Sequence, residues 1–313
     1  MSASEIITFN TPEIANPFDQ ILTDCQYDPN KIPDRYENHR TKRNAQSKSK
    51  LLSPEFSGWQ TDEILHMLHT QESPFVDPRN NLTLYARPPS QIRELVVEIQ
   101  EDIQDVAPCI WVTPPDFLHL TVMEMASGRT ETDIEGFLSH LRNNGVIPDL
   151  VDYTFHHRTR LVKPVVSYDA AAMALSFVPA VGEEIADGDR YTYHHLRRDL
   201  FDRLAATGLL MKPRYTVPSA HVTIARFITQ DGFTVENSGP DGVHVVDQQR
   251  VAALVERIEQ INERLRQTYW PQANGDILRK GEWVVGQGKG LELCKGRSWY
   301  GGGENVVTGK GFP

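Results

Sequence analysis

The chain has 313 residues, 39% of them hydrophobic, with 32 basic and 42 acidic residues and a formal net charge of -10. This length suits one large domain or two closely packed lobes, and the apolar content is ordinary for a globular core. The excess of acidic residues disfavours a long nucleic acid as partner, because binding a polyanion is driven by basic side chains that release its counterions. A small nucleotide or a short RNA end is the easier partner.

No long apolar run occurs, and the first five residues have neither a basic end nor a hydrophobic stretch, so we expect no signal peptide and no membrane association. Cys25, Cys109 and Cys294 lie far apart without a CxxC pair, which fits a reducing compartment and offers no zinc-site spacing. We therefore expect a cytoplasmic protein without metal or cofactor, and leave a nuclear location open.

Residues 1–75 lack a strand pattern and hold short apolar clusters such as Ile64-Leu65, so we predict a mostly helical N-terminal extension. Its dense basic run, at positions 40–50, is interpreted as a solvated helix face rather than a nucleic-acid patch. From residue 76 to residue 313 the sequence shows alternating strand and helix patterns, which predict the main domain. Residues 82–87 alternate like a strand, and a helix beginning near Ser90 follows, with one apolar stripe: Ile92, Leu95, Val96, Ile99 and Ile103.

Further strands are predicted at residues 117–125, 160–168, 173–178 and 220–228. Helices are predicted from the stripe Leu196, Leu200, Phe201, Leu204 and over residues 251–265. Residues 282–285 and 291–293 predict a late hairpin, and the glycines between them are not followed by the helix that a dinucleotide loop needs. The order of elements suggests an internal duplication.

Two predicted strands, one in each half, carry the same His-x-Thr motif: His119-Leu120-Thr121 and His221-Val222-Thr223. Side chains alternate along a strand, so each histidine and its threonine point the same way. One such motif would more often be a buried structural histidine. Two, 102 residues apart and each after a proline-marked turn, predict a pair of imidazoles for acid-base chemistry near neutral pH, with threonine hydroxyls available to phosphate oxygens.

With these motifs the chain resembles the two-histidine (2H) phosphoesterase superfamily, in the branch of 2′-5′ RNA ligase-like proteins and cyclic phosphodiesterases, and a fungal type in particular. His221-Val222-Thr223-Ile224-Ala225-Arg226 is similar to the ligase-like second motif, and the likeness covers residues 80–300. The resemblance implies an α+β, bilobal fold in which two antiparallel sheets, with outer helices, surround a central groove.

The resemblance also implies an enzyme, a metal-independent phosphodiesterase that hydrolyses 2′,3′-cyclic phosphates of nucleotides or short RNA ends to 2′-phosphates. One histidine deprotonates water and the other protonates the departing 3′-oxygen. The sequence does not assign these roles; the working hypothesis makes His221 the base and His119 the acid. Alternatives are a nucleotide-binding module without turnover, an ADP-ribose cyclic phosphate phosphodiesterase, and an RNA-trimming enzyme that the acidic balance disfavours.

Three further residues are candidates for substrate binding. Arg226 would neutralise phosphate charge, but strict alternation places it on the face opposite His221, so it reaches the groove only if the strand twists or ends there. Tyr85 and Arg87 share one face of their strand, where they would line the groove and the ring would stack on a base, or else face solvent.

Overall fold

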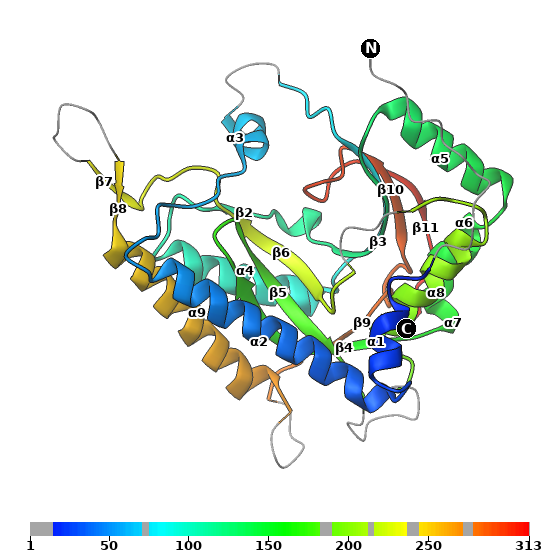
Figure 1. Ribbon diagram of the computed structural model, residues 1–313, viewed down its shortest axis with the longest axis horizontal. Coiled ribbons are helices and arrows are strands. Elements are labelled where there is room, and N and C mark those ends of the chain that lie inside the picture. Colours follow the sequence, from blue (N-terminus) through cyan, green and yellow to red (C-terminus); the bar gives the residue numbers. More distant parts are fainter. Residues whose placement is uncertain are drawn as a thin grey trace.

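In a computed structural model, the structure describes residues 15–70, 75–181, 190–211, 216–236, 244–271 and 278–312. Helices surround a large antiparallel sheet (Figure 1), so the chain is an α+β protein, as the resemblance implies. None of the helices in these ranges is both long and apolar enough to span a bilayer.

The large sheet has nine strands, and all of its pairings are antiparallel. They are β1 (Asn80–Ala86), β2 (Trp111–Val112), β3 (Leu120–Arg129), β4 (Arg160–Tyr168), β5 (Ala172–Pro179), β6 (Ala220–Arg226), β9 (Trp283–Val284), β10 (Glu292–Gly296) and β11 (Glu304–Thr308). Their order is β11-β10-β1-β3-β6-β5-β4-β9, with β2 beside β6, while β7 (Thr234–Glu236) and β8 (His244–Val246) form a separate ribbon.

The two halves of the sheet meet where β3 and β6 pair through Leu120 and Val222. The expectation of two separate sheets is therefore wrong: one continuous sheet carries both halves. The reason is local, because the apolar residue between the histidine and the threonine of each motif is buried at this junction, with at most 1% of its surface exposed. The junction places both motifs at the centre of the sheet.

Helices α4 (Ser90–Gln104) and α9 (Gln248–Tyr269) bury the apolar stripes that the sequence predicts. α4 packs on β6 and on α9, and α9 packs on β4. Each fully buried aliphatic side chain contributes roughly 1.5–3 kcal/mol, so these stripes hold the helices on the sheet.

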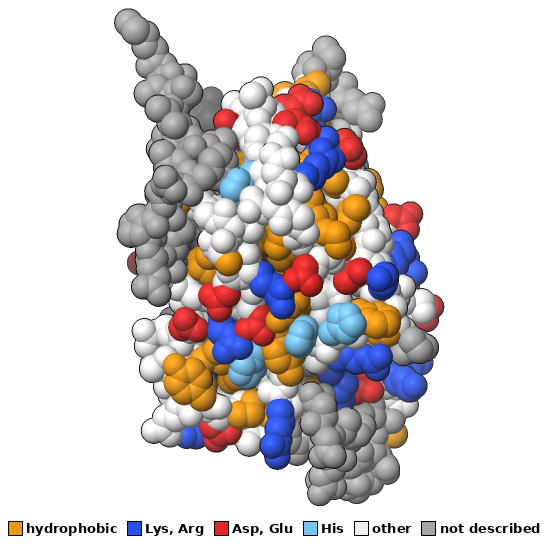
Figure 2. Space-filling model, turned by 90° about the vertical axis from the view of Figure 1, so that its right-hand side faces the viewer, with side chains coloured by type: hydrophobic (Ala, Val, Ile, Leu, Met, Phe, Trp, Pro, Cys, Tyr) orange, Lys and Arg blue, Asp and Glu red, His pale blue; other side chains and the backbone are white. Residues whose placement is uncertain are grey.

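Four helices cover the other end of the molecule: α5 (Glu131–Asn143), α6 (Ile147–Val151), α7 (Tyr153–His156) and α8 (Tyr193–Ala205). α5 packs on β1, β3 and β10, and α8 packs on β3. Thr130 and Thr192 begin α5 and α8 with capping boxes. Over this face acidic and basic side chains are interspersed (Figure 2).

Four further elements lie before β1: α1 (Asp19–Asp24), η1 (Pro29–Lys31), α2 (Ile32–Leu51) and α3 (Glu63–Thr70). α2 crosses in front of the β4 and β5 end of the sheet (Figure 1). Arg40 fixes it there, because its buried guanidinium donates to the carbonyl oxygens of Lys163 (2.6 Å) and Ser176 (3.1 Å). These polar contacts position α2 together with its buried Ile32, Tyr36 and Leu51.

Two predicted elements differ from the structure. The late hairpin is wrong, because β9 pairs with β4 while β10 pairs with β1 and β11, at opposite ends of the sheet. A tight turn, in which the N–H of Gly290 donates to the carbonyl of Gly286 (2.7 Å), redirects the chain between them. The strand predicted from residue 117 begins only at Leu120, since η2 (Pro115–Phe117) precedes it.

Candidate active site

The register between β3 and β6 brings the two His-x-Thr motifs together. Leu120 and Val222 pair in antiparallel strands, so His119 comes beside Thr223 and Thr121 beside His221. Because Leu120 and Val222 occupy equivalent places in the two motifs, a local pseudo-twofold axis passes through their pair. Two imidazoles and two hydroxyls from opposite halves of the chain therefore share one face of the sheet.

A β-bulge follows each motif and changes which later residue faces the site. Against β1, the residues Thr121 and Met123 pair with the adjacent Tyr85 and Leu84, so one residue of β3 is extra. Against β5, Thr223 and Ala225 likewise pair with adjacent residues. An extra residue inverts the alternation beyond it. Glu124 and Arg226, at equivalent places, consequently turn toward the motif side chains.

These side chains line a cavity of about 70 Å³. The volume is several times the roughly 10–15 Å³ that a water molecule needs, so a small polar group fits. The lining comprises the four motif side chains together with Asn81, Thr83, Tyr85, Trp111, Thr113, Glu124, Arg197, Ser219, Arg226, Trp299 and Tyr300. Hydroxyl, imidazole, guanidinium and indole groups converge there, a set rich in hydrogen-bond donors for an anion.

His119 is held by its Nδ1 atom, which lies 2.8 Å from the carbonyl oxygen of Phe117. A carbonyl only accepts, so Nδ1 carries the proton and the neutral ring keeps Nε2 as its basic atom. The ring also lies against Tyr85, with centroids 4.1 Å apart. Gly301 closes over this arrangement at φ +91°, where a Cβ atom would overlap the Phe117 carbonyl and lie 2.8 Å from Nδ1 of His119.

His221 has a different partner, because its Nδ1 lies 2.9 Å from the hydroxyl oxygen of Ser219. A hydroxyl both donates and accepts, so this contact suits either tautomer of the ring. The two histidines are thus oriented by different groups, although their motifs are alike.

The pKa of both histidines is lowered to about 4, chiefly because burial disfavours the charged imidazolium. Charge interactions with neighbouring basic side chains add to this effect: with Arg87, His221 and Arg226 for His119, and with Arg197, Arg43, Arg226 and His39 for His221. The Phe117 carbonyl acts in the opposite direction on His119. Without an anion, both rings are neutral at pH 7. A bound anion would offset the cationic field and raise both pKa values.

Arg226 lines the cavity, and a residue from before β1 positions it. Its Nη1 lies 3.6 Å from Oδ2 of Asp62, and the other oxygen of that carboxylate accepts a hydrogen bond from the Tyr300 hydroxyl (2.7 Å). Arg197 reaches the cavity from α8, with Nε donating to the carbonyl of Val122 (3.2 Å). The site therefore draws on the segments before β1 and after β10 as well as on the two motif strands.

The other two candidate residues, Tyr85 and Arg87, contact the groups that surround His119. Tyr85 lines the cavity but has only 2% of its surface exposed, and its hydroxyl donates to the carbonyl of Ser298 (2.6 Å). Its ring therefore contacts His119 rather than offering an open face to a base. Arg87 pairs with Glu292 (2.7 Å) and donates to the Leu118 and Gly301 carbonyls, so it braces the loops around His119.

Sequence reasoning missed Glu124, Arg197, Asp62 and Gly301. Glu124 had a detectable signal, because it stands three residues after Thr121 just as Arg226 stands three after Thr223. Arg197, Asp62 and Gly301 lie in other segments, and only tertiary contacts bring them to the motifs. Within the described ranges no three His, Cys, Asp or Glu side chains gather as a metal site would require.

Comparisons with known proteins give a distant likeness of fold. No protein-family model matches the chain, and no curated protein is similar to it in sequence. TT0787 of Thermus thermophilus is 16% identical, with 68% of this chain and 87% of that chain covered and a TM-score of 0.34. Usb1 of Kluyveromyces marxianus is 15% identical, with 75% and 99% covered and a TM-score of 0.36.

The same Usb1 with uridine monophosphate is also 15% identical, with 74% of this chain and 97% of that chain covered and a TM-score of 0.37. At such identities and TM-scores no activity is carried over from these proteins. The chemistry of this site has to be inferred from its own residues.

Proposed function

We propose that the chain is a metal-independent phosphodiesterase that hydrolyses the 2′,3′-cyclic phosphates of nucleotides or short RNA ends to 2′-phosphates. One observation supports this above all: two imidazoles and two threonine hydroxyls meet about a pseudo-twofold axis at one donor-rich cavity. A tetrahedral phosphate presents nonbridging oxygens for the two hydroxyls and, on opposite sides, an attacking and a departing oxygen for the two histidines.

In the proposed reaction a neutral histidine takes a proton from water as the water oxygen attacks phosphorus. The bond between phosphorus and the 3′-oxygen breaks, and the second histidine gives its proton to that oxygen, which leaves a 2′-phosphate. The substrate anion raises the pKa of the pair, so one proton is available to the site once the substrate is bound. The proton accepted by the base and the proton lost by the acid then exchange with solvent.

The surroundings of the two rings favour His119 as the acid and His221 as the base. The Phe117 carbonyl stabilises the protonated form of His119, whereas Arg197 is the strongest charge that lowers the pKa of His221. Arg226, held near Asp62, would balance the charge of the phosphate.

A panel of 2′,3′-cyclic mononucleotides, ADP-ribose cyclic phosphate and short cyclic-ended RNAs tests the proposal, with phosphorus NMR to identify the product. We expect a 2′-phosphate from the cyclic mononucleotides, formed at the same rate in excess EDTA, because acid-base histidines suffice for the reaction. A product that is mainly the 3′-phosphate would mean that the acid faces the 2′-oxygen of the ribose instead of the 3′-oxygen. Loss of activity on chelation, restored by a divalent ion, would contradict the mechanism, and tight binding of every ligand without turnover would favour a nucleotide-binding module.

A further inference from the structure

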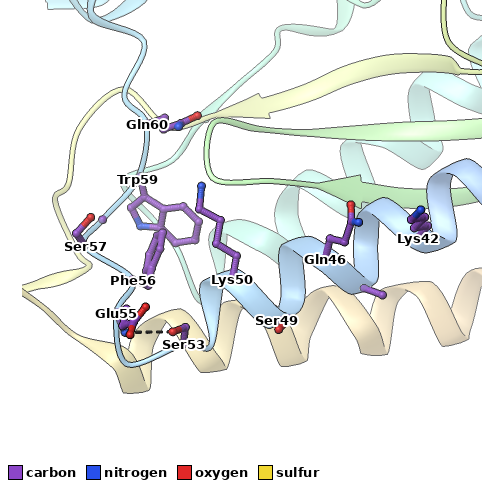
Figure 3. Close-up of a pocket in the computed structure, with 12 residues that line it drawn as sticks. Lys42, Gln46, Ser49, Lys50, Ser53, Glu55, Phe56, Ser57, Trp59 and Gln60 are labelled. Carbon is purple, nitrogen blue, oxygen red and sulfur yellow. Dashed lines mark hydrogen bonds between the residues drawn. The ribbon is translucent and has the colours of Figure 1, made fainter.

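A large cleft lies between α2 and the 53–60 segment that follows it. Its volume is about 1070 Å³. Lys42, Gln46, Ser49 and Lys50 line one wall, and Ser57 and Gln60 lie on the other. In Figure 3 the side chain of Lys50 extends from the helix toward Trp59, and that of Gln46 stands on the helix between Lys50 and Lys42. We call this the α2 cleft.

Two lysines, Lys42 and Lys50, line the α2 cleft against a single carboxylate, in a chain that is acidic as a whole. From residue 38 to residue 54 the sequence has five basic residues and no acidic one. The carboxylate of Glu55 also lines the cleft, at the turn after α2, beside the hydrogen bond from its backbone N–H to Ser53 (3.2 Å, Figure 3). The remaining polar side chains of the wall can all donate hydrogen bonds, which suits phosphate oxygens.

The structure assigns different partners to the five basic residues. Arg40 is buried on the sheet, and Lys48 pairs with Glu259 of α9 (3.5 Å). Arg43 pairs with Asp169 (3.1 Å) and is near enough to lower the pKa of His221. Lys42 and Lys50 are exposed in the cleft and have no ion pair with any residue that the structure describes. The interpretation of this run as one solvated helix face is therefore incomplete.

Residues next to both walls of the cleft also act on the candidate active site. On α2, the charge of Arg43 lowers the pKa of His221, and Lys50 lies seven residues further along the helix, a rise of about 10 Å. On the other wall, Gln60 lies two residues before Asp62, whose carboxylate pairs with Arg226 in the cavity. A chain that enters the cavity by one end can therefore extend along α2.

We propose that the α2 cleft binds the phosphate backbone of a single-stranded RNA whose cyclic-phosphate end occupies the histidine cavity. This inference rests on the proposed function and narrows its substrate class to oligonucleotides. A mononucleotide fills only the cavity of about 70 Å³ and its mouth, whereas an RNA end also places its neighbouring phosphates beside Lys42 and Lys50. Trp59 is stacked on Phe227 (3.7 Å) and is 5% exposed, so phosphate contacts rather than base stacking would supply the binding.

The test uses the full chain and a fluorescein-labelled single-stranded RNA of eight nucleotides, with anisotropy measured over a range of salt concentrations. The Lys42→Ala/Lys50→Ala variant should bind about tenfold more weakly at low salt. Each lost phosphate contact on a single strand lowers the slope of log K against log salt by about 0.7, so the slope should fall by about 1.4. Lys48→Ala is the matched control and should bind as the wild type does, because Lys48 points to α9.

A second readout compares substrates: the ratio of kcat/KM for a cyclic-ended octanucleotide to that for a cyclic mononucleotide should fall about tenfold in the double variant. If the salt slope and the ratio of kcat/KM values were unchanged in the double variant, the α2 cleft would not be an RNA-binding site, and the proposed hydrolysis would be unaffected. A reduced slope without any hydrolysis would support the cleft and contradict the proposed function. If polyglutamate of equal charge bound equally well with the same dependence on Lys42 and Lys50, the assignment to RNA would be wrong.

Discussion

The motif strands β3 and β6 are alike in sequence pattern, in their central pairing and in the bulge that follows each motif, yet they differ in charge. Three residues beyond its threonine, β3 presents Glu124 and β6 presents Arg226. His119 has a carbonyl acceptor on Nδ1, whereas His221 has a hydroxyl. The pseudo-twofold symmetry positions the catalytic groups. The departures from it give the two histidines different surroundings and therefore different roles.

This difference matters because hydrolysis needs a base to deprotonate water and an acid to protonate the departing oxygen. A carbonyl acceptor favours a protonated ring, which is an acid, and a field of guanidinium groups favours a neutral ring, which is a base. The arginines on the β6 side also offer a place for the phosphate charge. Variants of the paired residues distinguish two chemically equivalent halves from halves with different roles.

The largest effect is expected at the two histidines. A positioned acid or base contributes about 10²- to 10⁴-fold, so His119→Ala and His221→Ala should each lower kcat for a 2′,3′-cyclic nucleotide by that factor. The double variant should fall well short of the product of the two effects, because both act in one proton-transfer step. Steady-state kinetics on purified variants measures this.

His194 supplies the control, since it is fully buried, its pKa is also lowered to about 4 by burial, and both ring nitrogens have protein partners: Tyr36 (3.1 Å) and the Phe18 carbonyl (2.8 Å). His194→Ala should lose about 1–3 kcal/mol of stability and keep its turnover per folded molecule. The cavity histidine variants should melt within a few degrees of wild type. Destabilised cavity variants with near-normal turnover would mean that those histidines are structural too.

The pH dependence comes next in size. With both pKa values lowered to about 4 in the free protein, the form with one protonated and one neutral histidine becomes about tenfold rarer for each pH unit above that value. We therefore expect kcat/KM to rise as the pH falls from 7 toward 5. Because the bound anion raises the pKa of the pair, the profile of kcat should lie at higher pH. If kcat/KM stayed constant or fell as the pH decreased from 7 toward 5, the active form could not be the one with one protonated and one neutral histidine.

Arg226 should contribute less than either histidine. A hydrogen bond to a charged group is worth roughly 1.5–3 kcal/mol, so Arg226→Gln should lower kcat/KM by about 10- to 100-fold. Arg226→Lys keeps the charge and should recover part of the loss. If Arg226→Gln behaved like wild type, the phosphate would have to lie away from the β6 side.

The smallest effect is expected at Glu124, the counterpart of Arg226. Removing a carboxylate from an anion-binding cavity should tighten inhibition by a 2′-phosphate product about two- to fivefold, in line with a screened charge interaction of roughly 0.5–1 kcal/mol. Inhibition constants for Glu124→Gln, with Glu124→Asp as the charge-conserving control, measure this. Weaker inhibition in Glu124→Gln alone would show that the carboxylate helps to bind the ligand.

Local sequence patterns predicted several of the helices and strands. The stripes from Ile92 to Ile103 and from Val251 to Leu265 are buried as predicted, because a period of three to four residues leaves a helix only one apolar face. The β-like runs at residues 160–168 and 173–178 likewise predicted β4 and β5. Pairing between distant strands has no such local signature, and the separate late hairpin and the two separate sheets were therefore wrong.

The sequence by itself determined that two His-x-Thr motifs stand in equivalent places 102 residues apart, since identity and spacing are written in the chain. Only the tertiary structure decided that Leu120 and Val222 pair, because strand register depends on packing across the whole sheet. It also decided that bulges turn Glu124 and Arg226 toward the motifs, and that Asp62, Arg197 and Gly301 reach them from distant segments. Such contacts join residues that are far apart along the chain, so no local pattern records them.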